Sequence, residues 1–188
     1  GNNQPVELLE LVTLLEEALG REAVKVEAPM QPGDVPTTYA DVDDLIRDVA
    51  ASHYTIPLPV ALSDSTHGTI KGFELVIARV RDAEGAEGIG YTYTVGAGGA
   101  AVHALVARDL APLLVGRDAG LVESLWQTMW WALHYGGRGG AQALAMSAVD
   151  IALWDLRARR QGAPLWRVLG GFDPRVPCYA GGIDLDFP

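Results

Sequence analysis

Two groups of polar side chains have types and spacing that suit ligand binding. The segment Ser63–Gly72 is polar, contains glycine and carries the first group: Ser63, Asp64, Thr66 and His67. The second group, Tyr91, Tyr93 and Thr94, precedes a glycine-rich stretch that ends at Gly99. Polar loops held by a rigid scaffold often carry binding residues. A solvated loop and strand aromatics packed on helices are the competing interpretations, and the residue types alone leave both open.

Other candidate sites carry weaker signals. Asp184 and Asp186 form an Asp-x-Asp pair, but a cation needs more oxygen ligands than one such pair offers. The glycine-rich stretch Gly136–Gly140 does not follow a predicted strand and lacks a Gly-Lys-Ser/Thr ending, so we expect a helix connector rather than a phosphate loop. Cys178 is the single cysteine, which excludes an internal disulfide. We expect it to be packed and inert.

Composition narrows the class of protein. The chain has 188 residues, a formal net charge of −10 and 49% hydrophobic residues. A strongly negative charge argues against a nucleic-acid surface. No apolar run approaches the ~18 residues of a membrane span, and no signal peptide is visible. We therefore expect a cytoplasmic globular protein without nucleic-acid or membrane partners, possible as a homo-oligomer.

Alternating apolar residues predict three strands, followed by helices. Strands are expected over Tyr54–Leu62, Phe73–Arg81 and Gly88–Val95, with prolines restricting the first to a sheet edge. Glu74 and Arg79 should point outward. Helical spacing predicts helices over 100–110, 121–134, 141–160 and 164–169, the first ending near Pro112 and the third burying Asp150. A buried strand, Val176–Ala180, follows. This order predicts an α+β fold, a three-stranded antiparallel meander packed on a helical bundle.

The first 50 residues differ in character from the rest. They contain a predicted helix, Pro5–Leu19, a short strand, Val24–Ala28, and a second helix, Asp41–Val49. So few elements bury too little surface to be stable alone. We expect domains over 1–50, 51–160 and 161–188, with residues 1–49 packing independently of the remainder.

The long helix carries the most specific motif. Its sequence AMSAVDIALWDL, from Ala145 to Leu156, continues through Pro164-Leu165 to Leu169-Gly170. It resembles the signature of the N-terminal capping domain in the mandelate racemase and muconate-lactonising branch of the enolase superfamily, except that Val168 replaces the usual leucine. The resemblance covers about residues 53–188. The strings SDSTHGTIKGFELVIARV, MWWALHYGGRGG and PCYAGGIDLDFP resemble the acid-sugar dehydratases of that branch.

This resemblance implies a chemistry and also what the chain lacks. The family abstracts the proton next to a carboxylate, with magnesium holding the enolate oxygens and lysine or histidine moving the proton. Those groups lie on later strands of a (β/α)₈ barrel, of which Val176–Ala180 would be the first. We therefore expect no catalytic residue and no metal ligand in this chain. Magnesium is expected in full-length relatives, and a sugar acid would bind only if a barrel is supplied.

The same resemblance assigns a role to the polar groups. Ser63–Gly72 matches the capping loop that folds over the substrate in the family, and Thr94–Gly99 matches the second such loop. Ser63, Asp64, Thr66, His67, Tyr91, Tyr93 and Thr94 are accordingly the candidate lid residues.

The N-terminal segment resembles another family. GNNQPVELLELVTLLEEALGREA and MQPGDVPTTYADVDDLIRDV are similar to the C-terminal lobe of glucuronate-type UDP-sugar 4-epimerases, over residues 1–49. That resemblance implies that Asp34 holds the nucleotide ribose, whereas Gln31 replaces an arginine near the diphosphate. Asp34 could equally be a turn residue. The NAD-binding glycine motif and the Tyr-x-x-x-Lys pair are absent, so this segment cannot catalyse epimerisation.

Three functional hypotheses follow. The chain is an inactive fragment of an enolase-superfamily dehydratase or racemase, a fragment of an NAD-dependent epimerase, or a non-catalytic chimeric scaffold. A fusion of truncated reading frames, an assembly artefact and an engineered sequence all fit this layout.

Overall fold

The computed structural model describes residues 8–22 and 44–178, which belong to two separate units, 1–43 and 44–188. In the first unit, α1 (Leu8–Leu19) confirms the predicted helix over its described residues. The predicted strand Val24–Ala28 and the candidate residues Gln31 and Asp34 lie outside the described residues. The second unit begins at Asp44, several residues before the expected boundary near residue 50.

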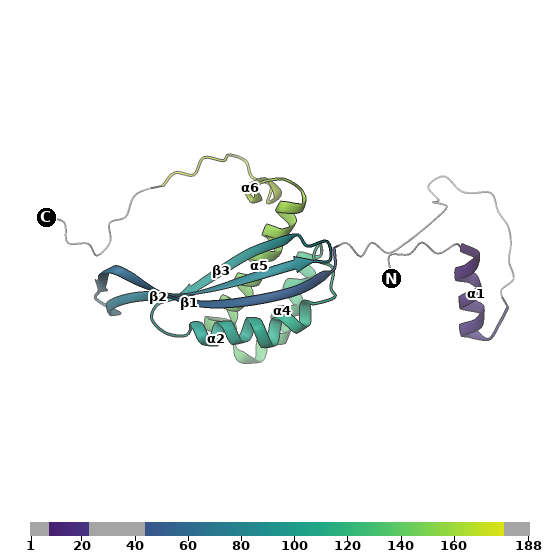
Figure 1. Ribbon diagram of the computed structural model, residues 1–188, viewed down its shortest axis with the longest axis horizontal. Helices are drawn as coiled ribbons and strands as arrows, with labels where there is room; N and C mark the ends of the chain where they lie inside the picture. Colours follow the sequence, from purple (N-terminus) through teal and green to yellow (C-terminus); the bar gives the residue numbers. More distant parts are fainter. Residues whose placement is uncertain (1–7, 23–43, 179–188) are drawn as a thin grey trace. The chain divides into compact units, whose positions relative to one another are not determined.

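The second unit is built on an antiparallel sheet with strand order β1-β2-β3 (Figure 1). The strands are β1 (Ile46–Asp64), β2 (Gly68–Asp82) and β3 (Glu87–Thr94). The helices that follow are α2 (Gly99–Ala104), η1 (Leu105–Leu110), α3 (Ala111–Leu114), α4 (Val122–Leu133), η2 (His134–Gly136), α5 (Gly140–Arg160) and α6 (Leu165–Val168). The predicted meander and its covering helices are thus confirmed.

The predicted helix Asp41–Val49 is wrong in its described part, because β1 begins at Ile46. Ile46 pairs with Asp82 and Asp48 pairs with Arg81, so one extra residue bulges from β1 between them. The bulge puts Ile46 and Val49 on the same buried face although they are three positions apart. A β-bulge therefore produced the spacing that resembled a helix.

The loop predicted over Ser63–Gly72 is also shorter than expected. Both strands extend into it, and only Ser65–His67 lie outside strands in this hairpin. Pairing shifts between Pro57↔Gly72 and Leu62↔Ile70, so four residues of β1 face a single residue of β2. Pro57 and Pro59 lie at this irregularity, where their missing N–H groups break the ladder.

One face of the sheet is buried under the helices. Alternate residues of β2, namely Val76, Ala78, Val80 and Asp82, point toward the helices and are all fully buried. On β3 the corresponding residues include Gly88 and Gly90, which lie against α5. A Cβ at Gly88 would overlap the carbonyl oxygen of Ala152, and one at Gly90 would overlap that of Ala148. The glycines allow α5 to lie directly on the strand.

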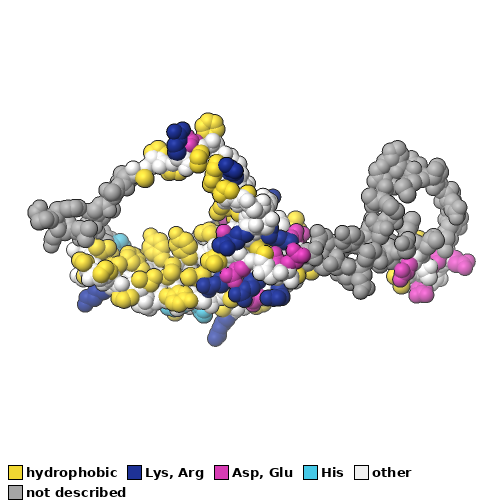
Figure 2. Space-filling view, turned by 45° about the horizontal axis from the view of Figure 1, so that its top comes forward, with side chains coloured by type: hydrophobic (Ala, Val, Ile, Leu, Met, Phe, Trp, Pro, Cys, Tyr) yellow, Lys and Arg dark blue, Asp and Glu magenta, His cyan; other side chains and the backbone are white. Residues whose placement is uncertain are grey.

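The opposite face of the sheet is exposed and largely apolar. The side chains of Tyr91 and Tyr93 are 58% and 57% exposed, and Phe73 contacts the ring of Tyr93 edge-on at 5.9 Å. The interpretation that the tyrosines pack on the helices is therefore wrong, because glycines occupy the helix-facing positions. Figure 2 shows hydrophobic side chains over much of this unit, with charged side chains gathered toward the end where β1 begins.

The helix predicted to end near Pro112 continues to Leu114. A π-helical stretch, η1, precedes Pro112, and the amide of Ala111 bonds to the carbonyl of Val106 across its wider turn. The wider turn lets the helix continue through Pro112, which has no N–H to donate. Helices α4 and α5 match their predictions.

The predicted buried strand Val176–Ala180 is not formed in its described part. Residues 176–178 belong to no strand, Val176 is 79% exposed and Cys178 is exposed. The expectation that Cys178 is packed is therefore wrong, since a parallel strand needs neighbouring strands to pair with. Asp184 and Asp186 lie outside the described residues. Among the described helices, none is long and apolar enough to cross a membrane.

Candidate functional site

Both candidate loops lie at the same end of the sheet. The hairpin tip Ser65–His67 joins β1 to β2, and the segment Val95–Gly98 joins β3 to α2. Thr94, which ends β3, pairs with Glu74 of β2, so the hairpin extends beyond the end of β3. Gly68 and Glu74 are six positions apart on β2, a distance of about 20 Å in an extended strand. The tip is therefore the outermost part of this end (Figure 1).

The predicted lid residues occupy three different settings. Ser63 and Asp64 end β1, while Thr66 and His67 lie in the exposed tip. Tyr91 and Tyr93 are on the exposed face of β3, which directs them away from the helices. Thr94 is half-buried and closes the strand. The structure thus places the first group together at the hairpin tip, and it brings Thr94 to the base of the second loop.

The base of the second loop is a polar cluster centred on Glu74. One carboxylate oxygen of Glu74 accepts hydrogen bonds from the Thr94 hydroxyl and the Gly99 amide, each at 2.9 Å. The other oxygen lies 3.1 Å from Nε2 of His53. The His53 ring lies 6.4 Å from that of His103, whose Nε2 is 3.3 Å from the Ala51 carbonyl oxygen. This cluster joins β1, β2, β3 and α2.

The cluster stabilises the ionised form of Glu74. The Gly99 amide, the Thr94 hydroxyl and the neighbouring His53 together lower the pKa of Glu74 below its ordinary value, although partial burial opposes them. The site also requires glycine at position 99, because a Cβ there would lie 2.6 Å from Nε2 of His53 and 2.8 Å from Cβ of Glu74. Glu74 is therefore a fixed hydrogen-bond acceptor rather than a candidate proton donor.

This cluster was not predicted from the sequence, because Glu74 was expected to point outward. The strand pattern contained the necessary signal. Glu74 has the same parity as Val76, Ala78 and Val80, which all point toward the helices. Arg79 has the opposite parity and does lie on the exposed face, so only half of that expectation was right. A charged residue in register with buried ones indicates a specific polar partner.

Metal binding finds no support in the described ranges. No group of three or more His, Cys, Asp or Glu side chains within residues 8–22 and 44–178 is placed to hold an ion. A surface hollow of about 340 Å³ lies at the other end of the sheet, lined by residues including Asp44, Arg157 and Arg160. Arg160 contacts Asp44 there and approaches the buried Asp82 at 3.6 Å. This hollow is separate from both loops.

Comparison with known proteins identifies the fold. Residues 46–170 match the model of the N-terminal domain of mandelate racemase and muconate lactonizing enzyme. The chain belongs to this family. The match begins at the residue that begins β1 and ends just after α6. The N-terminal resemblance to epimerases lies outside the match and stays a prediction.

Individual members of the mandelate racemase family are similar over most of the second unit. A 3,6-anhydro-α-L-galactonate cycloisomerase of Streptomyces coelicolor is 56% identical over 144 residues, 77% of this chain and 40% of that protein. An L-talarate/galactarate dehydratase of Salmonella typhimurium is 35% identical over 153 residues, 78% of this chain and 38% of that protein. The chain thus spans less than half the length of these relatives.

A solved structure agrees with the sequence comparison. The crystal structure of a racemase from Streptomyces coelicolor with bound magnesium superposes with a TM-score of 0.74 and 57% identity, over 77% of this chain and 40% of that one. The residues described here do not form a comparable metal cluster. Magnesium is thus a property of the relative and is not assigned to the described part of this chain.

Proposed function

We propose that residues 44–170 act as the capping domain of an enzyme that eliminates or rearranges a sugar acid. In this proposal the tip Ser65–His67 and the segment Val95–Gly98 cover the substrate. The observation that carries it is the 56% identity to the Streptomyces cycloisomerase over 144 residues. The position of both loops at one end of the sheet supports it, because a cap acts through a single contiguous surface.

The chain's own contribution would be recognition rather than bond breaking. The side chains near the hairpin tip are Ser63, Thr66 and His67, all exposed and able to hydrogen-bond hydroxyl groups. A sugar acid presents several hydroxyls and a carboxylate, so donors and acceptors at the tip suit its outer end. The proton abstraction itself needs a positioned base and a stabilised enolate. The described residues supply neither, so this chain should not turn over sugar acids alone.

A turnover assay tests the proposal directly. The 188-residue chain is incubated with magnesium and with talarate, galactarate or 3,6-anhydrogalactonate, and no product is expected. Residues 1–170 of this chain are then joined to the part of the Streptomyces cycloisomerase that follows its matching domain. We expect turnover of at least one sugar acid by the joined protein. Turnover by the 188-residue chain alone, or none by a folded joined protein, would contradict the proposal.

Two variants of the joined protein test the role of the tip. His67→Ala should lower kcat/KM by about tenfold, the size expected when a polar contact to substrate is lost. Glu84→Ala is the control, since Glu84 lies in the turn between β2 and β3 at the opposite end of the sheet. An unchanged kcat/KM for His67→Ala would show that the His67 side chain does not contact the substrate.

A further inference from the structure

We infer that Glu74 is the positioning residue of the second loop, because its carboxylate holds both ends of the segment Val95–Gly98. The inference rests on the proposed function in one respect, namely that this segment faces substrate. The clamp itself follows from the geometry alone.

The two ends of the loop meet at a single oxygen atom. Thr94 is the last residue of β3 and Gly99 is the first residue of α2, and both donate to the same carboxylate oxygen of Glu74 at 2.9 Å. The four residues between them, Val95–Gly98, belong to neither element. A hydrogen bond to an ionised acceptor is roughly twice as strong as one between neutral groups. The bonds therefore close this loop at its base.

The rest of the cluster fixes Glu74 in turn. Its side chain is 15% exposed, and its second oxygen is engaged by His53 at 3.1 Å. Gly99 approaches so closely that a Cβ would displace His53 or Glu74. The loop itself contains glycines with positive φ, 74° at Gly96 and 98° at Gly98. Such a glycine-rich loop has high conformational entropy when it is free. The hydrogen bonds to Glu74 offset the entropy cost of ordering this loop. They hold the segment Val95–Gly98 in one conformation before substrate binds.

The clamp distinguishes the two lid loops. The hairpin tip lies about 20 Å further along β2, as an extended strand of six residues requires, and an irregular stretch of β1 at Pro57–Leu62 separates it from the regular sheet. The segment Val95–Gly98 directly follows the end of β3, where Glu74 holds it. In the joined enzyme the second loop would thus set the shape of the site before substrate arrives.

Amide hydrogen exchange on the full 188-residue chain tests the clamp without any activity. Glu74→Ala removes the acceptor, and the Gly99 amide should then exchange at least about tenfold faster at pH 7, as loss of a charged hydrogen bond implies. Thr94→Val is the milder variant, which keeps the side-chain shape and removes one donor. It should speed exchange of the Gly99 amide, which shares the acceptor oxygen with Thr94, with little change in the urea unfolding midpoint. Glu84→Ala should leave exchange of the Gly99 amide unchanged.

The result that would overturn the clamp is exchange at the wild-type rate in both Glu74→Ala and Thr94→Val. Where Glu74→Ala fails to fold, Thr94→Val decides alone. A second readout uses the joined enzyme described above. There Glu74→Ala should raise KM more than it lowers kcat, because binding must then order the loop, and Glu74→Gln should restore part of the loss. A clamp confirmed by exchange with no change in KM would instead contradict the placement of this loop at the substrate.

Discussion

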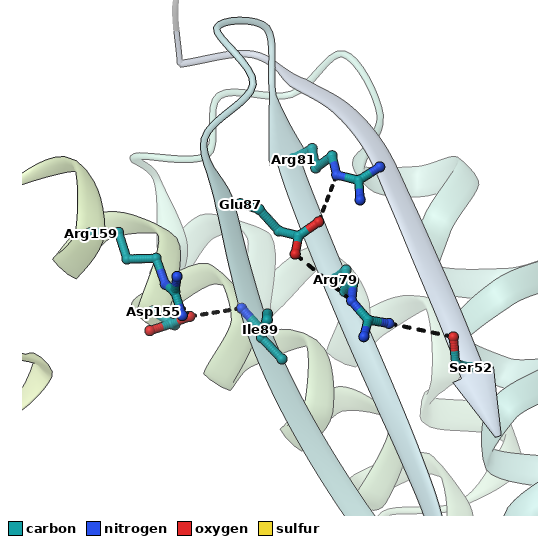
Figure 3. Close-up of polar contacts among 7 residues, drawn as sticks. All are labelled: Ser52, Arg79, Arg81, Glu87, Ile89, Asp155 and Arg159. Carbon is teal, nitrogen blue, oxygen red and sulfur yellow. Dashed lines mark hydrogen bonds and ion pairs between the residues drawn. The ribbon is translucent and has the colours of Figure 1, made fainter. Parts of the chain in front are cut away.

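The backbone amide of Ile89 donates a 2.8 Å hydrogen bond to the carboxylate of Asp155, which lies 66 positions later in the chain (Figure 3). Ile89 belongs to β3, at the edge of the sheet, and Asp155 belongs to α5. The same carboxylate oxygen accepts a 2.8 Å bond from Arg159 one turn further along α5. Asp155 thus accepts a hydrogen bond from an amide on the open edge of β3. This bond fixes the position of α5 along the strand.

Asp155→Ala should therefore lower the free energy of unfolding by about 1–2 kcal/mol, the usual cost of losing a hydrogen bond to a charged acceptor at a partly exposed site. Urea unfolding measures this change. Arg159→Ala is the matched control. Its side chain is 56% exposed, and an exposed pair contributes only ~0.2–1 kcal/mol. Equal losses in the two variants would show that the Ile89 bond contributes nothing.

The close packing of α5 on β3 makes a second prediction. Gly90→Ala should cost at least about 3 kcal/mol or prevent folding, because the new methyl group would overlap the Ala148 carbonyl and force the helix outward. Gly139→Ala serves as the comparison, since a Cβ there meets no atom within 4 Å and its φ of −153° suits any residue. Its effect should stay within about 1 kcal/mol. Circular dichroism and urea titration compare the two. A Gly90→Ala protein as stable as wild type would exclude this packing.

These glycines also show what the sequence could and could not reveal. The strands and helices were predictable because their apolar residues repeat at the periods of each element, and the motif from Ala145 to Leu156 indicated the family. The spacing of Gly88 and Gly90 by two residues carried the packing information as well, since both must lie on one face of a strand. Residue types alone left open whether Tyr91 and Tyr93 pack on the helices, and the two glycines decide against it because they occupy the helix-facing positions.

Other features depend on pairing and could not be read from local spacing. The bulge near Asp48 gave the apolar residues of a strand the spacing that is typical of a helix. Only the pairing of Ile46 and Val49 with β2 reveals the bulge. The Glu74 cluster likewise joins residues from β1, β2, β3 and α2. Its charge at an inward position was a signal, but its partners Thr94 and Gly99 are identified only by the antiparallel register.

The carboxyl group of Asp150 provides a prediction about pH. Burial, and then the charge of Glu123, raise the pKa of Asp150. The folded state therefore binds this proton more tightly than the unfolded state, and stability falls as pH rises through the interval between the two pKa values. Asp150→Asn should raise the urea midpoint at pH 7. The difference should shrink as pH falls through the raised pKa and vanish below the ordinary carboxyl range.

Glu123→Gln provides the control for that prediction. It removes the neighbouring charge but leaves Asp150 half-buried, so it should raise the midpoint less than Asp150→Asn because burial is the larger cause. Both variants are compared with wild type from about pH 3 to pH 8, a span that extends below the ordinary carboxyl pKa. An Asn variant less stable than wild type at pH 7 would show that the Asp150 carboxylate makes a favourable interaction that outweighs its burial.

The position of the first strand makes the last prediction, on where the second unit can be cut. A chain of residues 44–188 retains all of β1, including Ile46 and Val49, which are 1% and 7% exposed. It also keeps the bonds of Ile46 to the backbone of Gly116 and Arg117, each at 2.8 Å. We expect it to unfold at the same urea midpoint as the full chain, because residues 1–43 form a separate unit.

A chain of residues 53–188 begins inside β1 and should behave differently. It lacks both buried side chains, whose burial contributes roughly 1.5–3 kcal/mol each, and it lacks the six strand residues from Ile46 to Ser52 that pair with β2. That loss approaches the total stability of a typical domain, about 5–15 kcal/mol. At 25 °C we expect circular dichroism to show this shorter chain as largely unfolded and the 44–188 chain as folded. If both chains have the same midpoint, the start of β1 does not belong to the core, and the buried positions of Ile46 and Val49 are contradicted.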